Sequence, residues 1–139
     1  MKFLISILLT LFLLEGTSAQ QSRFFFRKLT VENGLSSGEI FTIAQDNNGF
    51  MWFSTRAGLN RFDGYEVKTY SHIAGDSTSI PTSLSRAMSV DSSGGFLIGL
   101  EDGMLEYDAR SDRFTPVKSL QNIWISQIVP ANQSTVYLS

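Results

Sequence analysis

Short apolar stretches alternate with polar turns through most of the chain. In the clearest stretch, apolar or alternating segments occur at 40–43, 50–55, 59–62 and 67–70, and turn-forming Asp, Asn and Gly residues lie between them. Because Asn and Gly tolerate the positive φ angles of tight turns, this pattern predicts short strands joined by hairpins. No convincing apolar period of 3.6 residues follows the first nineteen residues. The chain is therefore predicted to be all-β.

The first nineteen residues have a different pattern. Lys2 is followed by an almost wholly apolar run at 3–14. A membrane-spanning helix needs about 20 apolar residues, so this run is too short to be one. A buried amphipathic helix would need polar residues at helical spacing, which the run lacks. The small residues Thr17 and Ala19 complete a cleavage site, so we predict an exported chain with a signal peptide at 1–19.

The sequence repeats itself with a period of 45 residues. The segment 46–63 aligns without a gap on 91–108. The identical pairs are Asp46/Asp91, Gly49/Gly94, Gly58/Gly103 and Asp63/Asp108. Five further pairs stay apolar or aromatic, namely Met51/Phe96, Trp52/Leu97, Phe53/Ile98, Leu59/Met104 and Phe62/Tyr107. A period of about 40–45 residues is typical of the four-stranded blades of a β-propeller.

The repeat divides residues 20–139 into parts of one partial propeller. We place repeat 1 at 35–70, repeat 2 at 84–117 and a truncated repeat 3 at 123–139. The aromatic segment 24–29 precedes repeat 1 as 67–70 precedes repeat 2. We predict that it is a closing strand that completes the last blade, because closure removes the exposed sheet edges.

Two and a half blades do not make a propeller. A ring needs 4–8 blades, or about 180–360 residues at this period. We therefore expect an incomplete β-propeller whose missing blades belong to a longer chain, with covering by other copies as the alternative. Residues 20–139 alone should aggregate or stay partly unfolded, because two sheet edges lack partners.

Composition excludes most ready-made chemistry. The 139 residues carry a net charge of −2, which argues against a nucleic-acid partner. There is no cysteine and only one histidine, which excludes disulfide scaffolds, thiolate sites and His-cluster metal sites. No second apolar segment has spanning length, so no membrane segment is expected. With 42% hydrophobic residues, the chain can still bury a packed core.

Ligand contacts are predicted at three positions. Trp124 lies outside the fixed positions of the repeat, so it is our candidate for an aromatic platform that stacks on a sugar ring. Trp52 lies inside the repeat, and we expect it to pack in the core instead. Arg56 and Arg61 flank the turn at Gly58 and can hydrogen-bond sugar hydroxyls or carboxylates.

Other polar groups are interpreted as structural. The segments 46–49 and 91–94 each offer a single carboxylate, which is too few for calcium, so we interpret them as turns. An acidic cluster is interpreted as a solvated edge rather than a glycosidase pair; it consists of Glu101, Asp102, Glu106 and Asp108. His72 is expected at the surface. No catalytic residue, metal site or cofactor is predicted.

The first copy resembles a known repeat. The residues that carry the resemblance are Gly34-Leu35-Ser36-Ser37, Ile40, Ile43, Asp46, Gly49, Trp52, Thr55 and Gly58-Leu59-Asn60-Arg61-Phe62-Asp63. This set is similar to the two-component regulator propeller repeat. The second copy departs from it, with Leu97 in place of the tryptophan and Gly99-Leu100 and Met104-Leu105 at other fixed positions.

The resemblance implies a function. Such repeats form the periplasmic sensor region of hybrid two-component histidine kinases, in which an oligosaccharide or other small periplasmic ligand controls phosphotransfer and polysaccharide utilisation. It also implies a transmembrane helix, kinase and often DNA-binding parts beyond the propellers, the rest of the sensor chain as partner, and a homodimer in the full-length form. This chain itself would not be an enzyme. A fragment of a secreted propeller lyase or glycosidase, or a propeller interaction scaffold, are the alternatives.

Overall fold

The computed structural model describes residues 25–139 apart from 92, 133 and 134. The predicted signal peptide at 1–19 lies outside the described residues. The described part of the chain forms ten strands and two single-turn 3-10 helices. None of the helices among these residues has the length and apolar character needed to cross a bilayer. The all-β fold class is confirmed.

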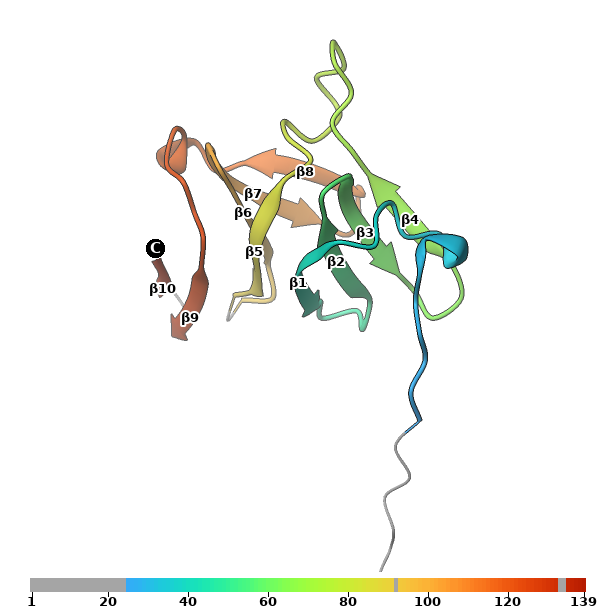
Figure 1. Cartoon of the computed structure of the whole chain (residues 1–139). Coiled ribbons are helices and arrows are strands. Elements are labelled where there is room, and N and C mark those ends of the chain that lie inside the picture. The colour runs from blue at the N-terminus through green and yellow to red at the C-terminus, as the bar shows by residue number, and fades with distance from the viewer. Residues whose placement is uncertain (1–24, 92, 133–134) are drawn as a thin grey trace, which may run out of the picture.

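Three antiparallel sheets follow one another along the chain (Figure 1). The first contains β1 (Ile40–Gln45), β2 (Met51–Thr55), β3 (Gly58–Phe62) and β4 (Val67–Tyr70). The second contains β5 (Ser85–Val90), β6 (Phe96–Leu100), β7 (Gly103–Asp108) and β8 (Arg113–Pro116). The third contains β9 (Ile128–Asn132) and β10 (Thr135–Leu138), and the helices are η1 (Val31–Asn33) and η2 (Lys118–Leu120). Within each sheet, every strand pairs with the next one in the sequence, as in a propeller blade.

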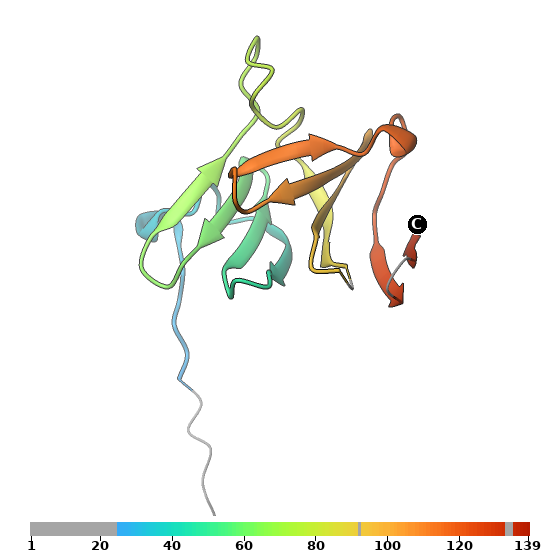
Figure 2. The ribbon, with the colours of Figure 1, turned by 180° about the vertical axis from the view of Figure 1, so that it is seen from behind.

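The first strands of the three sheets are neighbours. β1 contacts β5, and β5 contacts β9, so the sheets stand side by side with these strands innermost (Figures 1 and 2). Hairpin geometry then gives the sheets two ends. The turns after β1, β3, β5 and β7 lie at one end, the turn end, whereas the β4–β5 loop and the β8–β9 connection lie at the other, the loop end. This is the partial propeller that the period predicted.

Two equivalent glycines show why the repeat keeps its turns. Gly58 and Gly103 begin the third strand of their sheets with φ values of 138° and 152°. A Cβ atom at Gly58 would lie 2.3 Å from the carbonyl oxygen of Tyr70, and one at Gly103 would lie 3.1 Å from that of Leu120. Positive φ and the close approach of backbone both require glycine here.

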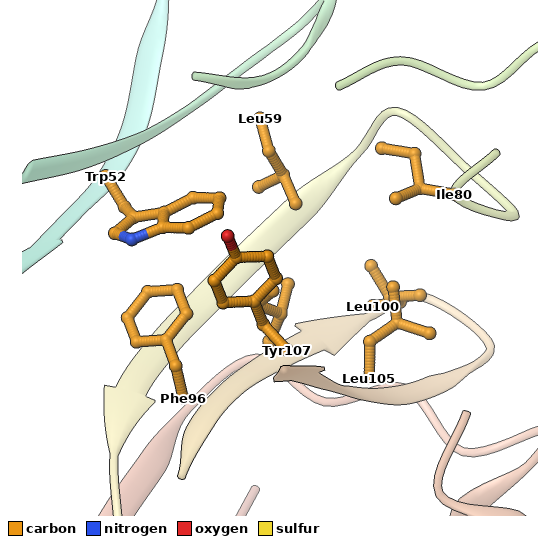
Figure 3. Close-up of a cluster of buried hydrophobic side chains, with 8 residues drawn as sticks. Trp52, Leu59, Ile80, Phe96, Leu100, Leu105 and Tyr107 are labelled. Atoms are coloured by element: carbon orange, nitrogen blue, oxygen red, sulfur yellow. The ribbon is translucent and has the colours of Figure 1, made fainter. Parts of the chain in front are cut away.

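The core between the first two sheets takes side chains from both of them (Figure 3). Trp52 and Leu59 come from the first sheet and Ile80 from the β4–β5 loop. The second sheet contributes Phe96, Ile98, Leu100, Leu105 and Tyr107. A separate aliphatic cluster joins the second and third sheets and consists of Ala87, Leu97, Met104, Ile125 and Ile128. Each junction between sheets therefore buries its own apolar surface, which is the main stabilising term.

The departures of the second copy have a structural reason. In the first sheet, the buried Asn60 accepts a hydrogen bond from the backbone N–H of Ser36 at 2.8 Å, and the Ser36 hydroxyl lies 2.9 Å from that of Thr55. The equivalent positions of the second copy are Leu105 and Leu100, and both are buried in the core between the sheets. The polar pair holds the lead-in segment in the first copy, and the leucines fill the core in the second.

The described residues of the segment expected to close the ring, 25–29, form no strand. Residues 25–30 have no regular secondary structure, and Phe25 and Phe26 are exposed. Arg27 nevertheless fixes the segment against the first sheet, because it donates a hydrogen bond of 2.8 Å to the carbonyl oxygen of Gly64 and stacks on Phe62. A closing strand needs a blade to pair with, so this pairing at 24–29 stays a prediction.

Candidate functional site

The two Asp turns of the repeat are built alike. In the first, Asp46 Oδ1 accepts hydrogen bonds from the backbone N–H groups of Asn48 at 2.9 Å and Phe50 at 3.0 Å. In the second, Asp91 Oδ1 accepts them from Ser93 and Gly95, both at 2.8 Å. The carboxylates are used to fold the backbone, which confirms the interpretation of both segments as turns.

The first turn has an additional partner in the core. The indole N–H of Trp52 donates a hydrogen bond of 2.8 Å to Asp46 Oδ2. Trp52 is completely buried and stacks on Phe96 at a centroid distance of 5.0 Å, while Tyr107 meets it edge-on at 4.7 Å. The prediction that Trp52 packs in the core is confirmed.

A polar cluster closes the outer side of the same junction. Asp112, in the β7–β8 turn, accepts hydrogen bonds of 2.6 Å from the hydroxyls of Tyr70 and Tyr107 on Oδ1. Arg61 donates to the same oxygen at 3.0 Å, and Lys68 pairs with Oδ2. We call this set the Asp112 cluster. It joins three side chains of the first sheet to a turn of the second.

The cluster changes the acidity of its members. Partial burial by itself would raise the pKa of the Asp112 carboxyl, but hydrogen bonds from Lys68, Tyr107 and Tyr70 outweigh it and hold that pKa well below its usual value. Burial, and then the hydrogen bond to Asp112, raise the pKa of Tyr70, and the same two causes raise the pKa of Tyr107. The phenols therefore stay neutral donors and the carboxylate stays charged.

Arg61 is held on several sides. Its guanidinium lies over the ring of Phe50 at 4.8 Å, and it also donates to the hydroxyl of Tyr107. Its side chain is only 19% exposed. This position, predicted as a ligand contact, belongs to the Asp112 cluster, and its role toward a ligand stays a prediction.

Two grooves flank the junction of the first two sheets. The turn groove, of about 520 Å³, is lined at the turn end by residues 46–48, 93–96 and 106–110. The loop groove, of about 490 Å³, is lined at the loop end by residues 72, 73, 75–77 and 79–81 together with Leu105, Phe114 and Pro116. Both volumes lie within the range of about 300–1,000 Å³ typical of ligand pockets.

The grooves differ in the state of their polar groups. In the loop groove, Asp76 accepts from Thr78, Ser79 donates to the carbonyl oxygen of Asp76, and His72 Nδ1 lies 3.0 Å from that of Ile80. The loop therefore satisfies its own polar groups, and what it presents to the groove is largely apolar. The turn groove holds amide, carboxylate and guanidinium groups instead.

The three predicted ligand residues do not converge. Arg56 lies in the β2–β3 turn at the loop end, and its guanidinium pairs with Glu39 at 2.8 Å. Arg61 lies toward the turn end of the first sheet, opposite Trp52 in the strand register. Trp124 lies in the β8–β9 connection and is 62% exposed. They could contact one ligand only if it were long.

The acidic cluster is solvated, as predicted. All four carboxylates, at positions 101, 102, 106 and 108, belong to exposed residues. The first two form the β6–β7 turn at the loop end, and the last two lie near the turn end of β7. His72 is exposed as well. Among the residues that the structure describes, no group of three or more His, Cys, Asp or Glu side chains is placed to hold a metal ion.

Sequence reasoning missed the Asp112 cluster. In the repeat register, Asp112 corresponds to Val67 and Arg61 to Glu106, so the cluster is not copied from one repeat to the next. Asp112 lies 42 positions after Tyr70 and 51 positions after Arg61 in the sequence. Neither spacing matches the repeat or a local motif, so nothing in the sequence indicates that these residues meet.

Residues 34–57 match the family described as "Two component regulator propeller". The matched segment runs from the lead-in through the first Asp turn to the end of the second strand. The resemblance found in the first copy is therefore confirmed over this segment.

A relative and two solved structures are similar to larger parts of the chain. Histidine kinase P4 of Formosa agariphila is 44% identical over 75 residues, which are 54% of this chain and 6% of that kinase. The extracellular domain of a protein assigned as a one-component system of B. thetaiotaomicron superposes on 85% of this chain with a TM-score of 0.66 at 19% identity. That of a protein assigned as a hybrid two-component system of the same organism gives a TM-score of 0.48 at 19% identity over 81%.

The chain spans only a small part of each of these proteins. It covers 6% of the kinase, 18% of the first solved chain and 23% of the second. The likeness to the first solved structure supports the fold. The local identity to the kinase and the match to the repeat family are both similarities in sequence.

Proposed function

We propose that this chain belongs to the extracytoplasmic sensor region of a hybrid two-component histidine kinase. The observation that carries the proposal is the match of residues 34–57 to the two-component regulator propeller, on a segment that folds as the first half of a four-stranded sheet. The identity of 44% to part of a histidine kinase supports it. Export by a signal peptide at 1–19 to the periplasm and the missing blades as partner belong to the same proposal.

The proposed activity is non-covalent recognition of an oligosaccharide. Two grooves of about 500 Å³ at one junction offer room for several sugar residues. The described residues bring together no carboxylate pair in a buried cleft, which a glycosidase would need. The chain is accordingly proposed to bind its ligand without turning it over, and Trp124, Arg56 and Arg61 remain proposed contacts.

The experiment is titration calorimetry on the complete periplasmic region with a broad panel of oligosaccharides. We expect at least one saccharide to bind and to change autophosphorylation of the full-length protein in vesicles. Absence of binding to every saccharide in the panel would contradict oligosaccharide sensing. Hydrolysis or elimination of a saccharide by the periplasmic region alone would favour the propeller enzyme instead.

A further inference from the structure

The turn groove lies between the Asp turns of the first two sheets. Asn47 and Asn48 form its wall on the first sheet, and residues 106–110 form the wall on the second. The buried side chains of Phe96 and Tyr107 lie at its base. Tyr107 also donates to Asp112, so the base of the groove is held by the Asp112 cluster.

Some polar groups of this groove are already used by the fold. The Asp46 carboxylate accepts hydrogen bonds from two backbone N–H groups and from the indole of Trp52, and it is largely buried. The Asp108 carboxylate accepts from the backbone of Arg110 at 2.9 Å and from the Ser111 hydroxyl at 2.7 Å. Because most of their acceptor capacity is already used, these two carboxylates contribute negative charge to the groove and few free acceptor atoms.

Other polar groups remain available. Within the part of the chain that the structure describes, no hydrogen bond engages the side chains of Asn48, Glu106 and Arg110, and all three residues are exposed. The three groups are planar, and each places two polar atoms side by side. The amide offers a donor and an acceptor, the carboxylate two acceptors, and the guanidinium several donors.

This combination suits neighbouring hydroxyl groups. A hydroxyl donates one hydrogen bond and accepts up to two, so a pair on adjacent carbons of a sugar can exchange bonds with both atoms of an amide or accept from a guanidinium while donating to a carboxylate. A purely apolar or purely acidic surface offers no such match. A groove of about 520 Å³ also has room for more than one sugar ring.

The charge of the lining selects against anions. Asp46, Glu106 and Asp108 are acidic, and Arg110 is the single basic residue among the described lining residues. A uronate or sulfated sugar would bring further negative charge next to them, and like charges within a few ångströms repel.

We propose that the turn groove is a subsite for an uncharged saccharide, which Asn48, Glu106 and Arg110 hold through neighbouring hydroxyls. The inference rests on the proposed saccharide sensing and adds the position of the subsite and the charge class of its ligand. Because Asn48 belongs to a turn of the first sheet, and Glu106 and Arg110 belong to the second, a sugar held in this way contacts both sheets of the junction at once.

The test uses the complete periplasmic region that contains this chain, with maltotriose, cellotriose, xylotriose and trigalacturonate as probes in calorimetry. We expect wild type to bind a neutral probe, and the double variant Asn48→Ala/Arg110→Ala to lose at least about tenfold in affinity. The matched control Gln121→Ala/Lys118→Ala changes exposed residues near the loop end and should bind as wild type does. The variant Glu106→Gln should narrow the preference for neutral probes over trigalacturonate.

The outcomes separate the two proposals. If wild type binds a neutral probe and the double variant binds equally well, the subsite is wrong and saccharide sensing stands. Preference of wild type for trigalacturonate would overturn the charge class. Absence of binding by wild type to every probe would overturn the subsite together with this part of the proposed function. Melting curves of the variants check that they fold. If the double variant fails to fold, Glu106→Gln provides a second test, because it keeps the shape of the side chain and removes its charge.

Discussion

The indole nitrogen of Trp52 lies 2.8 Å from Oδ2 of Asp46, six positions earlier in the sequence. The same carboxylate folds the turn between β1 and β2 through its other oxygen. One aspartate therefore fixes a hairpin and orients the largest side chain of the core.

Replacing that aspartate should be costly. Asp46→Ala leaves the buried indole N–H and two turn N–H groups without their acceptor, and we expect a loss of about 2–4 kcal/mol in the free energy of unfolding. Asp91→Ala is the matched control, because Leu97 stands at the tryptophan position and only the turn loses its acceptor; we expect about 1–2 kcal/mol there. Urea unfolding of the complete periplasmic region measures both. Equal losses would show that the indole bond contributes nothing.

Acid should weaken the junction between the first two sheets. The pKa of Asp112 is lower in the folded state than in the unfolded chain, so its contribution to stability is full above the ordinary Asp pKa of about 4 and is lost as the pH falls below it. Asp112→Asn should therefore destabilise the protein at pH 7, and the difference from wild type should shrink at pH 3. Urea midpoints at the two pH values check this. A difference that does not change with pH would contradict the assignment.

The two candidate arginines should behave differently. Arg61→Ala removes the ion pair with Asp112 and the stacking on Phe50, and should lower stability by about 2–3 kcal/mol. Arg56→Ala breaks an exposed pair with Glu39, which solvent screens, and should leave stability unchanged within the error of the measurement. Thermal unfolding followed by circular dichroism compares them, and calorimetry with a bound saccharide tests their predicted role as ligand contacts. If the Arg61→Ala protein is as stable as wild type but binds the saccharide more weakly, Arg61 contacts the ligand and does not stabilise the fold.

Much of this architecture is readable from the sequence. The segments expected at 40–43, 50–55, 59–62 and 67–70 are the four strands of the first sheet to within two residues, because their alternation and turn residues are local signals. The shift of 45 residues carries the same pattern to the second sheet. The contacts between sheets could not be predicted in this way, since they depend on which side chains meet across a junction.

The Asp112 cluster shows that limit. Asp112 has a φ of 55° in a polar turn, where its identity suggests only a tolerance for left-handed backbone. Three of its four partners, Arg61, Lys68 and Tyr70, lie on the first sheet. The aspartate itself has no counterpart at the repeat spacing, where the first copy has Val67. The grooves were beyond prediction for the same reason, because each brings together segments that are far apart in the sequence.

Glycine at the start of the third strand should be irreplaceable. Gly58→Ala would place a Cβ atom 2.3 Å from the carbonyl oxygen of Tyr70 at a φ of 138°, and we expect a loss of at least about 2 kcal/mol in stability or failure to fold. Gly38→Ala is the control, because its Cβ meets nothing within 4 Å, and it should stay within about 0.5 kcal/mol of wild type. Soluble yield and thermal midpoints distinguish the two. Similar behaviour of both variants would argue against the close approach at Gly58.

Residues 20–139 produced without further blades should self-associate. Ile43 of β1 is 53% exposed, and Tyr137 of β10 is 66% exposed, on the first and last strands of the described sheets. Exposed apolar faces and open sheet edges favour association. Light scattering on the fragment tests this, and Ile43→Lys together with Tyr137→Lys should reduce the effect. A dispersed monomer with a cooperative melt would contradict it.

The two junctions between sheets use unlike chemistry, and this difference has a mechanical consequence. The first adds side-chain bonds that converge on Asp112 to its apolar core, whereas the side chains of the second form an aliphatic contact centred on Ile125 and Leu97. Directional bonds resist sliding and twisting, while apolar surfaces can slip past one another with little loss of contact. Strain that reaches the second sheet should accordingly be passed on to the first as a rigid-body rotation and be absorbed at the third.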